Sequence, residues 1–167
     1  MKLAFPNPTG HVFELSSELR SRGLEESRSS PRKRILLPIH RDQGALVQRM
    51  VNFLQPGTYV QPHLHPREGA SETILVLEGA LGFVIFDESG NVASVHRLAM
   101  GELIDIEPQV WHGVLALEPD TVILELKRGP YDDTDKTFAK WAPAEGEEGA
   151  RAYLEELESL FTRSAQS

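Results

Sequence analysis

The sequence predicts an all-β protein, a sandwich or barrel with a short helix before it and an amphipathic helix after it. Between residues 35 and 127, short runs rich in β-branched and aliphatic residues alternate with turn signals, a pattern typical of sandwiches and barrels. The runs are ILLPI, LVQRMVNFL, TYVQPH, TILVLE, LGFVIF, VASVHRL, ELIDIE, GVLALE and TVILELK. A chain of 167 residues is long enough to bury the core of one domain and leaves little room for a second.

Residues 1–34 are expected to form an N-terminal arm and a short helix. Prolines and a glycine interrupt any regular pattern at the start of this segment. A helix is predicted over residues 15–27, with Ser16 or Ser17 as the N-cap and Glu18 in the first turn. A serine oxygen at the cap accepts a backbone N–H, and an acidic residue is favourable at a helix N-terminus.

Residues 35–130 are expected to form the barrel and residues 131–167 to cover it. The loop DESGN predicts a hairpin, in which Gly90 supplies the positive φ. An amphipathic helix is predicted over residues 147–163, because apolar residues recur there at intervals of three and four. They are Tyr153, Leu154, Leu157, Leu160 and Phe161. We expect this face to pack on the outside of the barrel or on a partner subunit.

The composition excludes several classes of protein. A net charge of -8 argues against a general nucleic-acid binder, which carries a basic footprint. The chain has no cysteine, so neither disulfides nor thiolate ligands contribute. No run is long and apolar enough to span a membrane, and the first residues lack the apolar core of a signal peptide. We therefore expect a cytoplasmic protein with neither a membrane nor a nucleic acid as partner.

The tripeptide His63-Leu64-His65 predicts one side of a metal site. Residues i and i+2 of a strand project from the same face, so the two imidazoles can reach one ion, whereas a helix would splay them apart. Pro62 and Pro66 bracket the pair and argue against a helix, because proline cannot continue one.

Glu72 and His112 are the expected third and fourth ligands. Glu72 opens an apolar run after a loop, and His112 lies in a second turn region, GELIDIEPQVWHG. Nitrogen and carboxylate ligands without sulfur favour one divalent transition metal, such as Fe, Mn, Ni, Zn or Cu. The sequence does not choose among these metals.

The two stretches resemble the two motifs of the cupins. The first motif, G(X)5HXH(X)3-4E(X)6G, is matched by Gly57, His63, His65, Glu72 and Gly79, with six residues before the glutamate. The second motif, G(X)5PXG(X)2H(X)3N, is matched through Gly101, Pro108 and His112, with one extra residue before the proline and with Val110 and Ala116 replacing the glycine and the asparagine. The longer loop makes Glu68 an alternative ligand. Glu72 is preferred because it alone keeps the six-residue spacing to Gly79.

A narrower resemblance, over residues 30–146, is to the WbuC-type cupin metalloproteins. It is carried by LLPIHRDQGALVQRM, TYVQPHLHPRE, GVLALEPDTVILELKRGPY and DKTFAKWAPAEG. The resemblance implies a cupin double-stranded β-helix, or jelly-roll barrel, that holds a metal and has a role connected with bacterial surface polysaccharide. It also implies self-association through an exposed sheet edge, as in a homodimer. It implies no established reaction.

The predicted site is compatible with an enzyme or with a non-catalytic metal- and ligand-binding module. As an enzyme it would be an isomerase, an epimerase or a dioxygenase acting on a small polar, anionic, sugar-derived metabolite. Tyr59, which shares the strand parity of His63, and Glu125 are the candidates for moving protons, and the alternative for Glu125 is a side chain that faces solvent. The candidates for substrate binding are His40, Arg49, Gln61 and Trp111. From the basic stretch Arg32, Lys33, Arg34, Arg41 and Arg49, one or two side chains are expected at the cavity mouth, as anion-binding groups.

Overall fold

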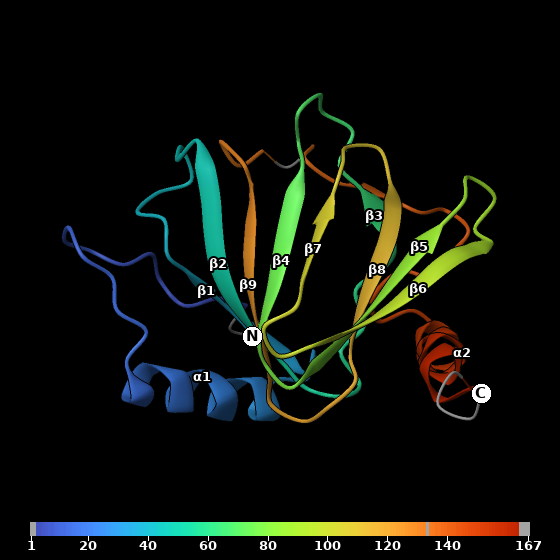
Figure 1. Cartoon of the computed structure of the whole chain (residues 1–167), viewed down its shortest axis with the longest axis horizontal. Helices are drawn as coiled ribbons and strands as arrows, with labels where there is room; N and C mark the ends of the chain where they lie inside the picture. The colour runs from blue at the N-terminus through green and yellow to red at the C-terminus, as the bar shows by residue number, and fades with distance from the viewer. Residues whose placement is uncertain (1–2, 133, 164–167) are drawn as a thin grey trace.

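Two five-stranded antiparallel sheets face one another in the computed structural model, which describes residues 3–132 and 134–163 (Figure 1). The first sheet has the order β1 (Arg34–Pro38), β2 (Val47–Leu54), β9 (Thr121–Arg128), β4 (Glu72–Glu78) and β7 (Leu103–Ile106). The second has the order β10 (Thr137–Phe138), β3 (His63–Leu64), β8 (Trp111–Ala116), β5 (Ala80–Phe86) and β6 (Val92–Ala99).

The strand order identifies the fold. From β2 to β5 the chain crosses between the sheets at every step, and after the β5–β6 hairpin it crosses again at β7, β8 and β9. This is the order of a jelly roll, the double-stranded β-helix of the cupin fold. The predicted fold class is therefore confirmed, including its two helices. The three segment boundaries proposed from the sequence stay predictions.

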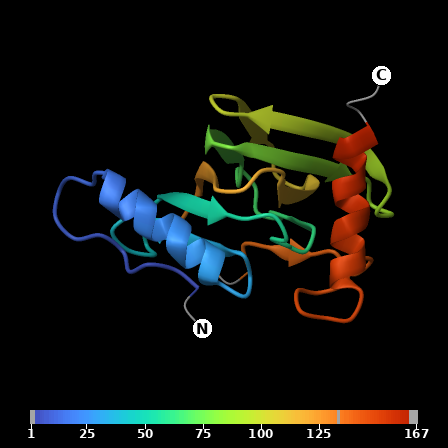
Figure 2. The same ribbon diagram turned by 90° about the horizontal axis from the view of Figure 1, so that it is seen from below.

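Two helices cover the outer faces of the sheets. Helix α1 (Ser17–Ser29) contacts β1 and β2, and α2 (Ala150–Arg163) contacts β5 and β6 (Figure 2). The side chain of Ser16 caps α1 by accepting the N–H of Leu19. Helix α2 begins three residues later than predicted, after Gly149, whose positive φ of 95° lies outside the helical region. Neither helix is both long enough and apolar enough to span a membrane. The cytoplasmic location stays a prediction.

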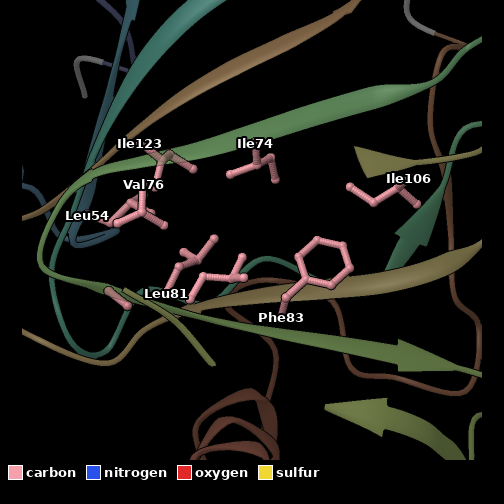
Figure 3. Packing of buried hydrophobic residues seen from close by; sticks show 9 residues of the cluster. Leu54, Ile74, Val76, Leu81, Phe83, Ile106 and Ile123 are labelled. Atoms are coloured by element: carbon pink, nitrogen blue, oxygen red, sulfur yellow. The ribbon is translucent and has the colours of Figure 1, made fainter. Parts of the chain in front are cut away.

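Three apolar clusters stabilise this arrangement. The central cluster lies between the two sheets (Figure 3) and consists of Leu54, Ile74, Val76, Leu81, Phe83, Leu98, Ile106, Ala116 and Ile123. A second cluster packs α1 on the first sheet and includes Leu24, Ile35, Val51, Phe53 and Val122. A third packs α2 on the second sheet and includes Tyr59, Val84, Phe86, Leu115, Leu154 and Leu157. Apolar packing therefore closes the barrel and covers both outer faces, while a group of buried polar residues lies on or next to β3, β4 and β8.

Candidate metal centre

Both sheets contribute to a buried group of four side chains. His63 and His112 are paired directly across β3 and β8 of the second sheet, so that their rings lie on the same face, with centroids 4.5 Å apart. His65 follows β3, and Glu72 reaches the group from the start of β4 in the opposite sheet. The strand pairing thus brings together residues that are far apart in the sequence.

The four side chains are close enough to share one ion. Their candidate ligand atoms all lie within 4.8 Å of one another. Oε2 of Glu72 is 3.2 Å from Nε2 of His112 and 3.5 Å from Nε2 of His65. All four residues are between 1 and 5% exposed. Glu68, the alternative carboxylate, is exposed and is not a member of the group.

Backbone carbonyl groups orient the three imidazoles. Nδ1 of His63 lies 3.1 Å from the carbonyl oxygen of Gln61, Nδ1 of His65 lies 2.7 Å from that of Asp135, and Nδ1 of His112 lies 2.9 Å from that of Val110. A carbonyl oxygen only accepts, so each Nδ1 carries the hydrogen and each Nε2 keeps its lone pair.

The Nε2 lone pairs of His65 and His112 accept no hydrogen bond from any described residue. Both Nε2 atoms are buried, an arrangement that costs free energy unless an ion or water completes it. The residues therefore fit a divalent metal ion, held by three imidazoles and one carboxylate.

The electrostatics of the group suit ligation as well. Burial lowers the pKa of His63 well below its ordinary value, so the imidazole is neutral. Burial alone would raise the pKa of Glu72, but the adjacent imidazoles of His112 and His65 hold it well below its usual range. A neutral imidazole and an ionised carboxylate are the forms that bind metal ions.

A second carboxylate lies beside Glu72. Glu125 of β9 lines the same cavity, and Nδ2 of Asn52 donates to its Oε2 at 2.8 Å. Burial and the neighbouring charge of Glu72 raise the pKa of Glu125 to about 7. A carboxyl group with this pKa can both take and give a proton near neutral pH.

The cavity has a volume of about 550 Å³ and contains part of the predicted site. His40, Gln61, Glu125 and two residues of the basic stretch, Arg32 and Arg34, line it. His40 is 2% exposed, and its Nε2 has no hydrogen-bond partner among the described residues. Gln61 donates from Nε2 to the carbonyl oxygens of Ala139 and Ala142.

Three predicted residues lie outside the cavity. Tyr59 packs against Tyr153 of α2 and donates from its hydroxyl to the carbonyl oxygen of Pro143. Its parity with His63 does not carry over, because only His63 and Leu64 form a strand in this stretch. Trp111 packs against Trp141, and the side chain of Arg49 is exposed.

Four residues near the group were not predicted from the sequence: Asn52, Lys127, Lys136 and Asp135. Strand alternation in β2 could have predicted the position of Asn52. This polar residue alternates with Met50 and Leu54, which face the inside of the barrel. Lys136 and the carbonyl of Asp135 come from the segment before β10, within the residues expected to cover the barrel, and no pattern pointed to them.

One family model matches the chain over half of its length. A family model described as "Domain of unknown function (DUF6016)" matches residues 15–98, half of the 167 residues. The chain belongs to this family. The DUF6016 match contains His63, His65 and Glu72, and it ends before His112. No protein of curated function matches the sequence.

Several solved structures are similar to parts of the chain. Oxalate decarboxylase from Bacillus subtilis has 20% identity and a TM-score of 0.48, over 57% of this chain and 24% of that one. KdgF from Halomonas sp. has 22% identity and a TM-score of 0.48, over 63% of this chain and 84% of that one. Lactobacillus farciminis oxalate decarboxylase has 17% identity and a TM-score of 0.47, over 57% of this chain and 28% of that one. The chain spans about a quarter of the length of the oxalate decarboxylases it matches.

Proposed function

We propose that the protein is a metal-binding cupin enzyme that acts on a small polar metabolite. One divalent transition metal ion, of the group Fe, Mn, Ni and Zn, is held by His63, His65, Glu72 and His112. The observation that carries the proposal is the convergence of these side chains in a buried group, with every Nδ1 held by a carbonyl oxygen and two Nε2 atoms lacking any described partner.

The residues around the group define what the chain itself contributes. When bound, the metal supplies a Lewis acid, or an oxygen-activating centre if it is iron. Glu125 takes a proton from the substrate at its carboxylate and returns it, as isomerisation or epimerisation requires. Asn52 holds this carboxylate in position through the bond from Nδ2. Gln61 and His40 form polar parts of the wall that orient the substrate.

The resemblance to WbuC-type cupins supports a sugar-derived substrate from surface-polysaccharide metabolism. The cavity of about 550 Å³ suits such a molecule, since pockets for small ligands span roughly 300–1,000 Å³. Isomerase, epimerase and dioxygenase chemistry are all open to a mononuclear site of this composition.

The second candidate function is a non-catalytic module that holds a metal and a small ligand. It is favoured by the position of Tyr59, which leaves Glu125 as the one predicted proton-transfer residue that lines the described cavity. Ligand binding without product formation, under every metal tested, would support the module.

The test is a screen of metal-loaded protein against sugar nucleotides, small diketones and hydroxy acids, with the metal content measured in parallel. We expect His112→Ala to lose both the metal and the turnover. His96→Ala removes an exposed histidine outside the group and should keep both. Full metal occupancy in His112→Ala would contradict the proposal.

A further inference from the structure

The charged groups nearest the candidate metal centre leave room for an anion. Glu72 and Glu125 balance Lys127 and Lys136, which line the same cavity. A divalent metal ion on the proposed ligands would add two positive charges that none of these four groups offsets. Uncompensated charge is costly in a partly buried cavity, so the loaded site favours an anionic ligand. This inference rests on the proposed function.

Arg32, Arg34, Glu145, Asp135 and Asp132, which also line the cavity, each have a partner among the described residues. Nε and Nη2 of Arg32 and Nη2 of Arg34 all donate to the carboxylate of Glu145 at 2.7 Å. Oδ1 of Asp135 lies 3.6 Å from Nη2 of Arg67. Asp132 accepts hydrogen bonds from the backbone N–H and the hydroxyl of Thr134.

Lys136 lines the cavity beside the candidate ligands. Phe138 is paired with His63 across β10 and β3, with ring centroids 6.0 Å apart. Lys136 precedes β10 and lines the cavity together with Phe138 and His63. On its other side, the carbonyl oxygen of Asp135 bonds to Nδ1 of His65. Lys136 thus follows directly on a residue that touches one candidate ligand.

The ammonium group of Lys136 is also uncommitted within the described structure. No described residue accepts a hydrogen bond from it, and the side chain is half-buried. Its charge acts on the group nonetheless. Burial is the largest cause that lowers the pKa of His63, and the positive charge of Lys136 is the second. Glu125 and Glu72 attract the ammonium group of Lys136.

We propose that Lys136 binds a carboxylate of the substrate, so that the substrate class is a small polar organic acid. Lysine presents a compact point charge with three donors, which suits one carboxylate group at the side of the cavity. The carboxylate offsets part of the charge that the metal introduces, while the rest of the acid faces Glu125 and the polar wall. Lys136 is therefore a specificity-determining residue supplied by the C-terminal covering segment.

Calorimetric titration of the zinc-loaded protein with malonate, a small dicarboxylate, tests the assignment. Malonate should bind to the wild type and at least about tenfold more weakly to Lys136→Met, which keeps the length of the side chain and removes its charge. Lys136→Arg should stay within a few-fold of the wild type. Lys140→Met, which removes an exposed lysine of the same segment, should leave binding unchanged. Malonamide, which is neutral, should bind weakly to every variant.

The readouts separate the two proposals. Zinc content, measured on each sample, should be equal in all four proteins. Equal malonate affinity in the wild type and Lys136→Met would overturn the role of Lys136 and leave the metal centre standing. A zinc-loaded wild type that does not bind malonate would also overturn it. A wild type that takes up no zinc would overturn the proposed function itself, together with this inference.

Discussion

Asn52 donates a hydrogen bond of 2.8 Å from its Nδ2 to Oε2 of Glu125, joining β2 to β9 on the inner face of the first sheet. Glu125 in turn interacts with Glu72, the one carboxylate in the group of candidate ligands. The neutral amide of Asn52, the carboxyl group of Glu125, which titrates near neutrality, and the ionised carboxylate of Glu72 therefore lie in a row beside the proposed metal. The inner face of this sheet is specialised for charge as well as for packing.

Glu125→Gln should make the metal-free protein more stable at and above pH 7. Burial and Glu72 raise the pKa of Glu125 to about 7 in the folded state, against about 4.3 in the unfolded chain. The unfolded state therefore gives up the proton first, and the carboxyl group costs stability as the pH rises between these values. We expect a gain of about 3–4 kcal/mol at pH 8 that vanishes below about pH 4.

Chemical denaturation across this pH range, in the presence of a chelator, measures the difference. Glu107→Gln, which changes an exposed carboxylate, is the control. A stability difference that does not vary with pH would show that Glu125 does not carry the expected titration.

Glu72→Gln should weaken metal binding by at least about tenfold and leave the fold intact. The change preserves the shape of the side chain and removes the charge that His112 and His65 face, and even residues behind the ligands change metal affinity by about 10–100-fold. Glu68→Gln is the matched control, because Glu68 is exposed and was the alternative ligand. Competition with a chromogenic chelator gives both affinities. Equal losses in the two variants would contradict the choice of Glu72.

Glu145→Gln should lower the free energy of unfolding by about 1 kcal/mol at pH 7. Glu145 accepts hydrogen bonds from Arg32 and Arg34 at the cavity mouth. Burial raises its pKa, but these two guanidinium groups more than offset that effect and the pKa is lowered. The stabilisation is therefore present above the unfolded pKa of about 4.3 and is lost as the pH falls through the folded one.

Urea denaturation at pH 7 and at pH 3 checks this dependence on protonation. Glu148→Gln, an exposed neighbour in the same segment, should change stability little at either pH. A Glu145→Gln deficit that persists undiminished at pH 3 would mean that the charge of Glu145 does not act through Arg32 and Arg34.

Gly23→Ala should destabilise the protein even though alanine favours helices. A Cβ on Gly23 would overlap the ring of Phe53, which is fully buried between α1 and the first sheet. Overpacking costs about 1–3 kcal/mol, and helix propensity returns about 1 kcal/mol at most. Ser21→Ala, at an exposed position of α1, should be neutral or slightly stabilising. Thermal unfolding of both variants decides the matter, and a Gly23→Ala protein as stable as the wild type would refute the close contact.

Local chemistry explains what could be predicted of the fold and of the site. The alternation of His63 and His65, the cap at Ser16 and the hairpin turn at Gly90 each depend on neighbouring residues, and the structure contains all three features. Glu72 lies in the opposite sheet, so no local pattern places it beside these histidines. Its position there was expected from motif spacing.

Non-local packing explains what could not be predicted. Strand parity failed at Tyr59 because a two-residue strand does not extend its alternation through Pro62. On β9, Val122 packs under α1 while Ile123 packs between the sheets, so both faces of the strand are covered. Alternation alone therefore left the environment of Glu125 open. Lys136 was missed because the pairing of β10 with β3 depends on tertiary contacts.

In the proposed metal centre, three imidazoles and one carboxylate share a single metal ion. Anomalous diffraction from crystals of protein purified without added metal, recorded above and below the absorption edges of iron, manganese, nickel and zinc, tests it most directly. We expect one anomalous peak at about 2.0–2.2 Å from nitrogen atoms of His63, His65 and His112 and from an oxygen of Glu72. The absence of any peak there, with the imidazoles turned apart or bridged only by water, would contradict it.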